Sequence, residues 1–471
     1  MKSTSAAFES NAVEALLDPD LQASLNKMGF RAARQRVVDE VPEWEAIRAA
    51  AREIKEHTLA HLDYYLEQFE SKVVANGGHV HWASTPEEAQ AIVLDILRNA
   101  NAKKVTKGKS MAGEETGINE ALAKAGIERL ETDLGEYIIQ LADEPPSHII
   151  APAIHKTKDQ ITELFHEHHA KHGKTERVTD VAAIVNEARE VLRQGFLSAD
   201  AGITGGNFLV AETGTVALVT NEGNGDLTNT LPDVHIVTAG IEKVIPTLED
   251  LSTMLRLLAR SATGQEMSVY TTMMTGPKRP NDQDGPSEYH VVLIDNGRSS
   301  WLGNEFHEML RCIRCGACIN HCPVWNTIGG HAYGWVYPGP MGSVLTPLMT
   351  SLDEAGHLPN ACTMNGHCQT VCPMSIPLPS LLRRLRFRQF DHGLVKWSVN
   401  AVLGLWGYVA KRPKLYHILS GVGIRALSLV SFGRGRFKWL PFMKGWTQAR
   451  DFPAPQKTTF MAQYRAGKGR R

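Results

Sequence analysis

The sequence predicts an α/β domain, then a small helical domain built around cysteines, and then a basic helical region at the C-terminus. Three observations predict this order. Strand-like and helix-like segments alternate through residues 71–300, all 7 cysteines fall between Cys312 and Cys372, and residues 380–471 contain 19 Lys and Arg against only Asp391 and Asp451. With 471 residues, 43% hydrophobic and 21% charged, the chain is no disordered tail, collagen-like fibre or small disulfide scaffold.

Residues 1–70 are expected to form a helical region of their own, since Ala, Glu, Arg and Leu dominate them. Near the end of this region Leu59, Leu62, Tyr65 and Leu66 follow one another at helical spacing. That spacing places apolar side chains on one face and predicts an amphipathic helix.

Residues 71–300 are expected to form the α/β domain, because strands that alternate with helices of this length are typical of βαβ units. The best-marked helix is TPEEAQAIVLDILRNANA, with Thr85 as N-cap and Glu88 three residues on. Further helices are predicted for EETGINEALAKAG, DVAAIVNEAREVLRQGFLSA and the stretch from Leu248 to Leu258. Strands are predicted in SKVVANGG, HVHWAS, KKVTKGKSM, VHIVTAGIEKVIP, MSVYTTMMT and YHVVLIDNG, with two more in GITGGNFLVAETGTVALVTNEGNGDL.

Residues 301–390 contain two cysteine motifs. The first is Cys312-x2-Cys315-x2-Cys318-x3-Cys322-Pro323. Thiolates at this spacing surround one iron–sulfur cubane, and the fourth ligates a second cluster in two-cluster ferredoxins. A structural zinc site usually takes its ligands as two pairs, and buried free thiols need no such spacing, so an iron–sulfur site is favoured over both.

The second motif, Cys362-x5-Cys368-x3-Cys372-Pro373, has the same layout with Asn365 at the place of one cysteine. In two-cluster ferredoxins the ligation is crossed, because the last cysteine of each motif binds the cluster of the other motif. Crossed ligation here would give one site four thiolates, from Cys312, Cys315, Cys318 and Cys372. The other site would hold Cys322, Cys362 and Cys368. It could carry a [3Fe–4S] cluster, a [4Fe–4S] cluster with one iron on water or on a side chain such as Asn365 or His367, or no cluster. We favour a second cluster held by three cysteines.

The segments RCIRCGACINHCPVWNTIGGHAYGWVYPGPMG and ACTMNGHCQTVCPMSIPLPSLL closely resemble the lactate utilisation protein B family, the iron–sulfur subunits of a three-part bacterial L-lactate-oxidising system. KGKSMAGEETGINEAL, ETDLGEYIIQLADEPPSHI and GITGGNFLVAETGTVALVTNEGNGD resemble its LUD domain. The resemblance runs from about residue 60 to beyond 440. It implies an isomerase- and CoA-transferase-like α/β domain, a two-cluster ferredoxin-type domain, and electron transfer to the respiratory chain beside a CCG-type subunit and a second LUD-domain subunit.

A pocket for a small anion is predicted in the α/β domain. Small residues in three loops, 205–207, 212–215 and 221–225, would let backbone N–H groups converge on a carboxylate or phosphate. Lys109 and Ser110 could add a charge and a hydroxyl, and Glu222 lies where related transferase folds carry a catalytic glutamate, which is an analogy of fold alone. The alternative is that these loops are tight turns. GITGGN lacks the spacing of a nicotinamide-binding fingerprint.

The region 391–471 is expected to form basic helices. Its charge makes residues 380–471 carry +17, while residues 1–379 carry −18, with 31 Lys and Arg against 49 Asp and Glu. The tail could pack on protein, touch anionic lipid or bind nucleic acid. Packing on protein is favoured, lipid contact comes second, and nucleic acid is the least favoured because no recognition motif is present. The first residues show no signal peptide, so a cytoplasmic protein is expected. Such a protein could also bind peripherally to the inner face of the cell membrane.

The cysteine spacing predicts an iron–sulfur protein, and the resemblance implies that it is the electron-transfer subunit of an L-lactate oxidation system, which converts lactate to pyruvate without NAD. The cysteines would be ligands, and the chain would act as part of an oxidoreductase complex. The alternative is a non-catalytic scaffold or sensor, in which the LUD domain binds a small carboxylate or a partner subunit.

Overall fold

The structure is a computed structural model that describes residues 3–25, 29–431, 433–440, 444–447 and 450–468. Contacts divide the chain into unit 1, Met1–His392, and unit 2, Gly393–Arg471. Unit 1 contains the α/β domain and the cysteine motifs, and unit 2 is the basic C-terminal region. Each unit is described by itself.

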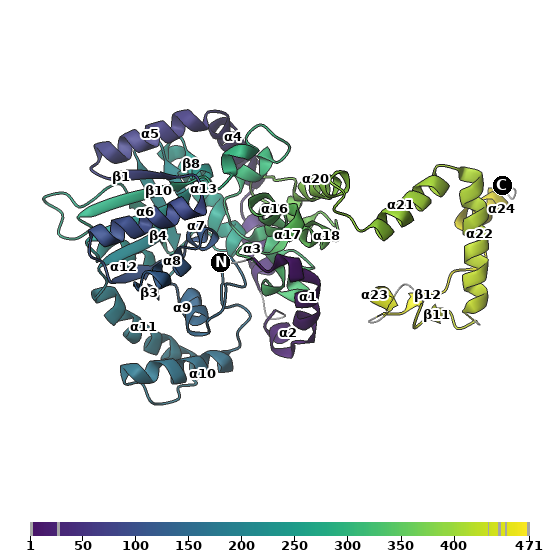
Figure 1. The fold of residues 1–471 in the computed structure, drawn as a ribbon, viewed down its shortest axis with the longest axis horizontal. Coiled ribbons are helices and arrows are strands. Elements are labelled where there is room, and N and C mark those ends of the chain that lie inside the picture. The colour runs from purple at the N-terminus through teal and green to yellow at the C-terminus, as the bar shows by residue number, and fades with distance from the viewer. Residues whose placement is uncertain (1–2, 26–28, 432, 441–443, 448–449, 469–471) are drawn as a thin grey trace. The chain divides into compact units, whose positions relative to one another are not determined.

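The main sheet of unit 1 runs in the order β1-β10-β7-β4-β2-β3, and all of its strand pairs are parallel (Figure 1). Its strands are β1 (His79–Ala83), β10 (Glu288–Ile294), β7 (Val234–Gly240), β4 (Ala201–Gly205), β2 (Lys104–Lys107) and β3 (Glu128–Glu131). Parallel pairing brings the carboxyl ends of these strands to one edge, where α/β folds bind ligands. The predicted α/β fold class is confirmed.

The main sheet is buried on both faces, as parallel sheets usually are. Val292 and Ile294 of β10 pack with α6 (Pro86–Asn99) and α8 (Ile118–Lys124) on one side. Val291 and Leu293 pack on the other side with α5 (Leu62–Ala75) and with a smaller sheet. The smaller sheet, in the order β8-β5-β6-β9, contains β8 (Val244–Ile245), β5 (Phe208–Val210), β6 (Thr215–Thr220) and β9 (Tyr270–Met274).

Several predicted elements differ from those observed. SKVV is not a strand but the last turn of α5, because Phe69 and Val73, four residues apart, are both fully buried on one helix face. The helix predicted over EETGINEALAKAG breaks at Gly117, whose φ of 72° is left-handed, into α7 (Met111–Thr116) and α8. The segment GITGGNFLVAETGTVALVTNEGNGDL holds three strands rather than two, and VHIVTAGIEKVIP holds β7 and β8 rather than one strand.

The predicted cap of α6 is confirmed: Thr85 Oγ1 accepts a hydrogen bond from the backbone N–H of Glu88 at 3.3 Å, and the Glu88 carboxylate accepts one from Ser84 N–H at 2.7 Å. The remaining helices of the α/β domain are α9 (Leu134–Leu141), α10 (Lys158–His169), α11 (Val181–Leu197), α12 (Asn224–Thr230) and α13 (Leu248–Ala262).

The N-terminal helices pack on the cysteine segment rather than forming a layer of their own. They are α1 (Phe8–Leu17), α2 (Pro19–Leu25), α3 (Phe30–Asp39) and α4 (Trp44–Ala60). The Ser5 hydroxyl donates a hydrogen bond to the Tyr333 carbonyl at 2.8 Å, and one hydrophobic core includes Phe8, Trp44 and Trp325. The first residues of the chain therefore help to enclose the segment that carries the cysteines.

The cysteine segment consists mainly of short helices joined by tight turns. They are α14 (Ala317–Asn320), α15 (Trp325–Ile328), α16 (Gly339–Met349), α17 (Leu352–Ala355), α18 (His357–Asn360), α19 (His367–Thr370) and α20 (Leu378–Asp391). The loop between the motifs is largely buried from Ala332 to Pro347. It therefore contributes apolar cover near the cysteines.

Unit 2 contains α21 (Trp397–Ala410), α22 (Pro413–Val430), β11 (Arg436–Phe437), α23 (Lys444–Thr447), β12 (Phe452–Pro453) and α24 (Phe460–Lys468). Neither α21 nor α22 has a buried residue. Within the described part of the chain, no helix is both long enough and apolar enough to cross a membrane.

Candidate functional site

The structure brings the four predicted thiols of the first site together around one small cavity. This cavity is lined by Cys312, Cys315, Cys318 and Cys372. Its wall is otherwise apolar and includes Met309, Ile313, Met341, Met374, Ile376 and Leu378. The fourth thiol thus comes from the second motif, in the crossed arrangement that the spacing predicts.

The other three cysteines, Cys322, Cys362 and Cys368, also lie near one another. Burial first, and then the charges of Cys362 and Cys322, raise the pKa of Cys368 to about 12. The buried hydroxyl of Tyr333 hydrogen-bonds to the sulfur of Cys322 and works against the rise that burial causes in the pKa of that thiol. The Cys318 thiol of the first site interacts with Cys368, so the two sets are neighbours.

The two motifs fold into matching turns fifty residues apart. Left-handed backbone occurs at corresponding positions: Arg314 (φ 58°) and Met364 (φ 59°), Gly316 (φ 73°) and Gly366 (φ 81°). A non-glycine residue rarely adopts this conformation, so its occurrence at both places reflects a shared loop geometry. Asn365 therefore occupies the turn position that Cys315 holds in the first motif.

Neither predicted substitute for the missing thiolate is free and buried. Asn365 is exposed, and its side-chain oxygen accepts a hydrogen bond from the backbone N–H of His367 at 3.1 Å. His367 is exposed as well, and its ring lies 4.9 Å from that of His321. Asn365 thus stabilises the turn with the oxygen it would need for coordination.

Two arginines of the N-terminal helices lie close to the thiols, and no local sequence pattern indicates them. Arg34 donates to the Val371 carbonyl at 3.0 Å, and Arg48 donates to the Cys372 carbonyl at 2.7 Å. Their positive charges counteract the rise that burial causes in the pKa values of Cys315 and Cys372. Such charges favour the thiolate form, which is the form that binds metal.

The donor set fits iron–sulfur clusters. All seven cysteines are free thiols, and four of them are buried. Backbone N–H groups point at three sulfurs: Met364 at Cys362 (3.3 Å), Trp325 at Cys322 (3.5 Å) and Ile376 at Cys372 (3.5 Å). Thiolate ligands with N–H···S bonds and apolar cover are what such clusters require.

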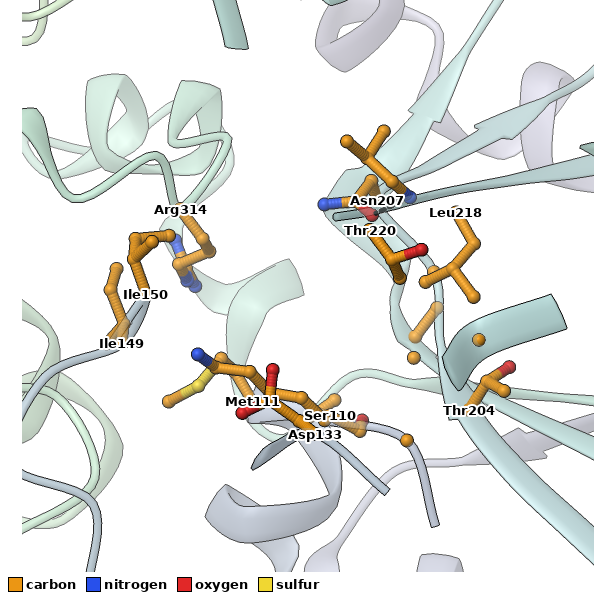
Figure 2. Close-up of a pocket in the computed structure, with 18 of the residues that line it drawn as sticks. Ser110, Met111, Asp133, Ile149, Ile150, Thr204, Asn207, Leu218, Thr220 and Arg314 are labelled. Carbon is orange, nitrogen blue, oxygen red and sulfur yellow. Dashed lines mark hydrogen bonds between the residues drawn. The ribbon is translucent and has the colours of Figure 1, made fainter. Parts of the chain in front are cut away.

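A second feature is a cavity of about 340 Å³ at the carboxyl edge of the main sheet (Figure 2). Residues that follow four strands line it: Lys109 and Ser110 after β2, Asp133 after β3, Gly206 and Asn207 after β4, and Glu242 and Lys243 after β7. The side of the cavity toward the cysteine segment is lined by Ile149, Ile150, Arg314 and Tyr337. Figure 2 shows Arg314 and the two isoleucines across the cavity from Asn207 and Thr220.

Part of the predicted anion pocket lies in this cavity. Lys109, Asn207 and Glu222 line it, whereas the loop 212–215 is not among the lining residues, so its predicted part in the pocket is wrong. Gly214 (φ 69°) makes a tight turn against α5, and a Cβ there would lie 2.6 Å from the nitrogen of Val73. The predicted alternative, a tight turn, holds for this loop.

The polar groups of two predicted pocket residues are held by the fold. The Ser110 hydroxyl lies 2.7 Å from that of Thr238 and accepts a hydrogen bond from Gly113 N–H. Glu222 accepts a hydrogen bond from Leu134 N–H at 3.2 Å, and burial, followed by the charge of Asp133, raises its pKa.

A buried ion-pair network joins the α/β domain to the cysteine segment. Arg298 makes two hydrogen bonds to Glu115, at 2.7 and 2.8 Å, and an ion pair to Glu242 at 2.7 Å. Glu242 also pairs with Arg314 at 3.3 Å, and the Tyr337 hydroxyl donates to Glu115 at 2.7 Å. Burial alone would raise the pKa of Glu242, but Arg298 and then Arg314 lower it to about 2.

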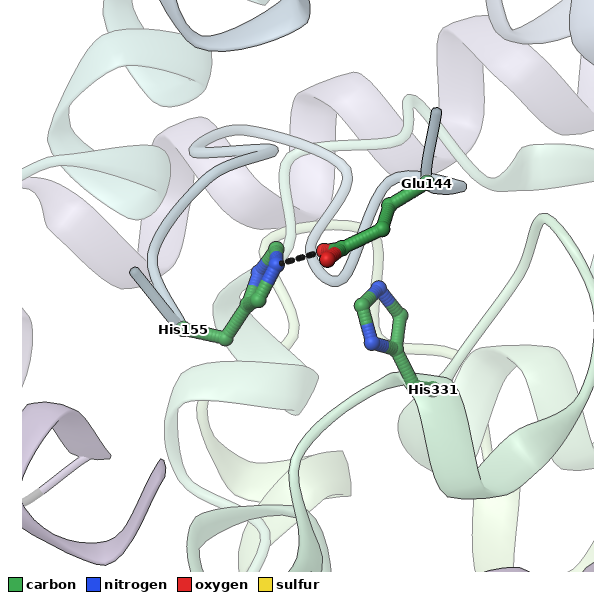
Figure 3. Close-up of side chains that lie close together, drawn as sticks. All are labelled: Glu144, His155 and His331. Carbon is green, nitrogen blue, oxygen red and sulfur yellow. Dashed lines mark hydrogen bonds and ion pairs between the residues drawn. The ribbon is translucent and has the colours of Figure 1, made fainter. Parts of the chain in front are cut away.

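A second contact between the domains involves Glu144, His155 and His331, whose candidate ligand atoms lie within 4.8 Å of one another (Figure 3). His155 lies 2.7 Å from the Glu144 carboxylate, which also pairs with Lys156. His331 is bonded to the Pro145 carbonyl at 2.8 Å. Because a lysine shares the carboxylate, we interpret this cluster as structural.

An α/β domain with a pocket at its strand ends, joined to neighbouring sets of four and three thiols, defines a two-site iron–sulfur protein. Family models agree with this class: the LUD domain matches residues 66–294, and the 4Fe-4S dicluster domain matches residues 308–376.

Curated relatives match over nearly the whole chain. Lactate utilization protein B of Lysinibacillus sphaericus is 43% identical, covering 98% of this chain and 97% of its own length. Lactate utilization protein B of Bacillus subtilis is 43% identical, covering 92% and 90%. The uncharacterized electron transport protein YkgF of Escherichia coli is 41% identical, covering 99% and 98%. The chain belongs to the lactate utilization protein B family.

Among solved structures, a DUF162 family protein from Deinococcus radiodurans is similar at 18% identity and a TM-score of 0.27, over 50% of this chain and 98% of that one.

Proposed function

We propose that this chain is the iron–sulfur electron-transfer subunit of a system that oxidises L-lactate to pyruvate and passes the electrons to the respiratory chain. The observation that carries the proposal is the pair of neighbouring thiol sets, the first formed by Cys312, Cys315, Cys318 and Cys372. Oxidation of lactate releases two electrons and two protons, and two bound clusters would supply a pair of one-electron carriers. The names of the relatives support lactate as the substrate of the system.

The residues of this chain would set the properties of those carriers. Arg34 and Arg48 place positive charge beside the first thiol set, and Tyr333 donates a hydrogen bond to Cys322 in the second. Hydrogen bonds to sulfur and nearby cations favour the reduced, more negative state of a cluster. We further infer that the second cluster is held by Cys322, Cys362 and Cys368 alone, because Asn365 is exposed and bonded to its own turn.

The proposed partners are a CCG-type subunit and a second LUD-domain subunit. We expect L-lactate to reduce the clusters of the anaerobically purified protein only when both partners are present, as measured by bleaching of the visible absorption and by EPR. Dithionite reduction of the protein alone is the control for competent clusters. Clusters that dithionite reduces but that lactate and both partners leave oxidised would favour the alternative, a non-catalytic scaffold or sensor.

The basic unit 2 is proposed to contact an anionic membrane surface. The helix α21 contains no charged residue, and Lys396, Lys411 and Arg412 flank it. Its Trp397 and Trp406 side chains are 83% and 63% exposed. A helix that is apolar around most of its circumference requires apolar surroundings, and Trp beside Lys and Arg is typical of the membrane interface.

We expect the protein to sediment with vesicles of anionic phospholipid, and to do so less at high salt because counter-ions screen the attraction. The double variant Trp397→Ser/Trp406→Ser should bind about tenfold more weakly, since it loses two large apolar contacts. Trp82→Ser, at an exposed tryptophan of unit 1, is the matched control. Equal binding by the double variant and wild type would contradict membrane contact through α21.

A further inference from the structure

The cavity at the sheet edge is shared between the LUD domain and the loop that carries the first cysteines. Most of its wall comes from the strand ends, but Arg314 lies between Cys312 and Cys315 in the sequence and also lines it. We propose that this cavity binds a small organic carboxylate between Lys109 and Lys243, and that occupancy lowers the redox potential of the cluster held by the first thiol set. The second part of this proposal rests on the proposed function.

Two lysines of the cavity wall interact with nearby carboxylates only through longer-range electrostatics, without a direct contact. Among the described residues, neither Lys109 nor Lys243 makes a hydrogen bond or an ion pair through its ammonium group. The other cations of the wall are already engaged, because Arg298 and Arg314 pair with Glu242. An anion that enters the cavity therefore meets two ammonium groups that are available to it.

The acidic residues of the wall leave room for an anion. The Asp133 carboxylate accepts a hydrogen bond from Glu136 N–H at the start of α9, and Glu222 accepts one from Leu134 N–H in the same turn. Both carboxylates therefore face the positive end of a helix, which offsets part of their charge.

The opposite wall fits the carbon chain of such a ligand. Ile149, Ile150 and Met111 line the cavity with apolar surface. Pockets that combine an apolar wall with a few polar groups bind small organic molecules, and a volume of about 340 Å³ accommodates a short carboxylic acid with water. The chemistry of this wall favours an aliphatic carboxylate over inorganic phosphate.

The link to the first thiol set runs through charge. Lys243 interacts electrostatically with Cys312, and burial, followed by the charge of Arg314, lowers the pKa of Lys243 to about 8. The guanidinium of Arg314 lies over the Tyr337 ring at 5.1 Å and interacts with Cys312. A bound carboxylate would neutralise positive charge beside these thiols. Added electrons are then less stabilised, so the potential falls.

The test measures binding and potential separately on the full-length, cluster-loaded protein. Calorimetry with L-lactate, pyruvate and inorganic phosphate gives the affinities, and EPR-monitored redox titration gives the potential with and without each ligand. We expect lactate or pyruvate to bind, phosphate to bind at least about tenfold more weakly, and the potential of the first cluster to fall on binding.

Matched variants locate the site. Lys109→Gln and Lys243→Gln should each weaken carboxylate binding about tenfold, and Lys243→Gln should also lose the ligand-dependent fall in potential. Lys104→Gln, at an exposed lysine of β2 paired with Glu128, should leave both unchanged. Binding that is equal in all variants, or tighter for phosphate, would overturn the site.

Binding without any change in potential would overturn the coupling. Because these measurements need no partner subunit, their failure is distinguishable from failure of the lactate-reduction assay.

Discussion

Replacing Asn365 with cysteine should raise the iron content of the anaerobically purified protein from about seven to about eight atoms per chain. The reason is the turn that both motifs share. Met364 and Gly366 have the same left-handed backbone as Arg314 and Gly316, so a thiol at position 365 would lie in the second motif where Cys315 lies in the first. We expect the oxidised wild type to give the EPR signal of a three-iron cluster, and Asn365→Cys to lose it. Iron and sulfide analysis with EPR makes the measurement.

The matched control is Thr363→Cys, which adds an exposed thiol to the same turn at a position without a counterpart among the cysteines of the first motif. It should leave both the iron content and the signal unchanged. Eight irons in the wild type, with no three-iron signal, would show that a group other than a cysteine completes a four-iron cluster and would refute the three-iron assignment. Cys368→Ser should abolish the signal altogether, which ties it to the second thiol set.

Local patterns predicted much of this molecule. The alternation of strands and helices identified the α/β fold class, and the Thr85 cap placed the start of α6. The cysteine spacing, with the crossing known for two-cluster ferredoxins, grouped Cys372 with the thiols of the first motif, and the structure places it there. Each of these signals depends on a few neighbouring residues or on a spacing with a strong geometric constraint.

Such local patterns do not predict contacts between segments that are distant in the sequence. Arg34 and Arg48 read as ordinary positions of polar helices, and nothing local indicates that their guanidinium groups bond to carbonyls more than 300 residues away. No local pattern indicates Lys243 either, because it lines the pocket only through its place after β7 at the edge of the folded sheet. The strand wrongly predicted at Val73 has a related cause. Two β-branched residues in a row favour a strand locally, but burial of this face against the rest of the domain makes the segment helical.

Replacing Arg298 with methionine should destabilise unit 1 by about 3–5 kcal/mol, the typical loss when one partner of a buried ion pair is removed. Arg298 is 2% exposed and holds two buried carboxylates, those of Glu115 and Glu242. Without it, Glu242 keeps the longer contact to Arg314, and Glu115 keeps hydrogen bonds from the Tyr337 hydroxyl and the Asn296 side-chain amide. Anaerobic denaturant unfolding, followed by circular dichroism, measures the effect.

The loss of stability should also affect the cysteine segment, because the network joins the two domains. Glu115 and Glu242 belong to the α/β domain, whereas Arg314 and Tyr337 belong to the cysteine segment. Arg298→Met should therefore also speed the release of iron to a chelator. Adding Glu115→Gln should recover part of the stability, since it removes one uncompensated charge. Arg256→Met is the control: it breaks an exposed pair with Glu43 and should cost less than about 1 kcal/mol. If both arginine variants unfold at the same denaturant concentration, the network does not hold the two domains together.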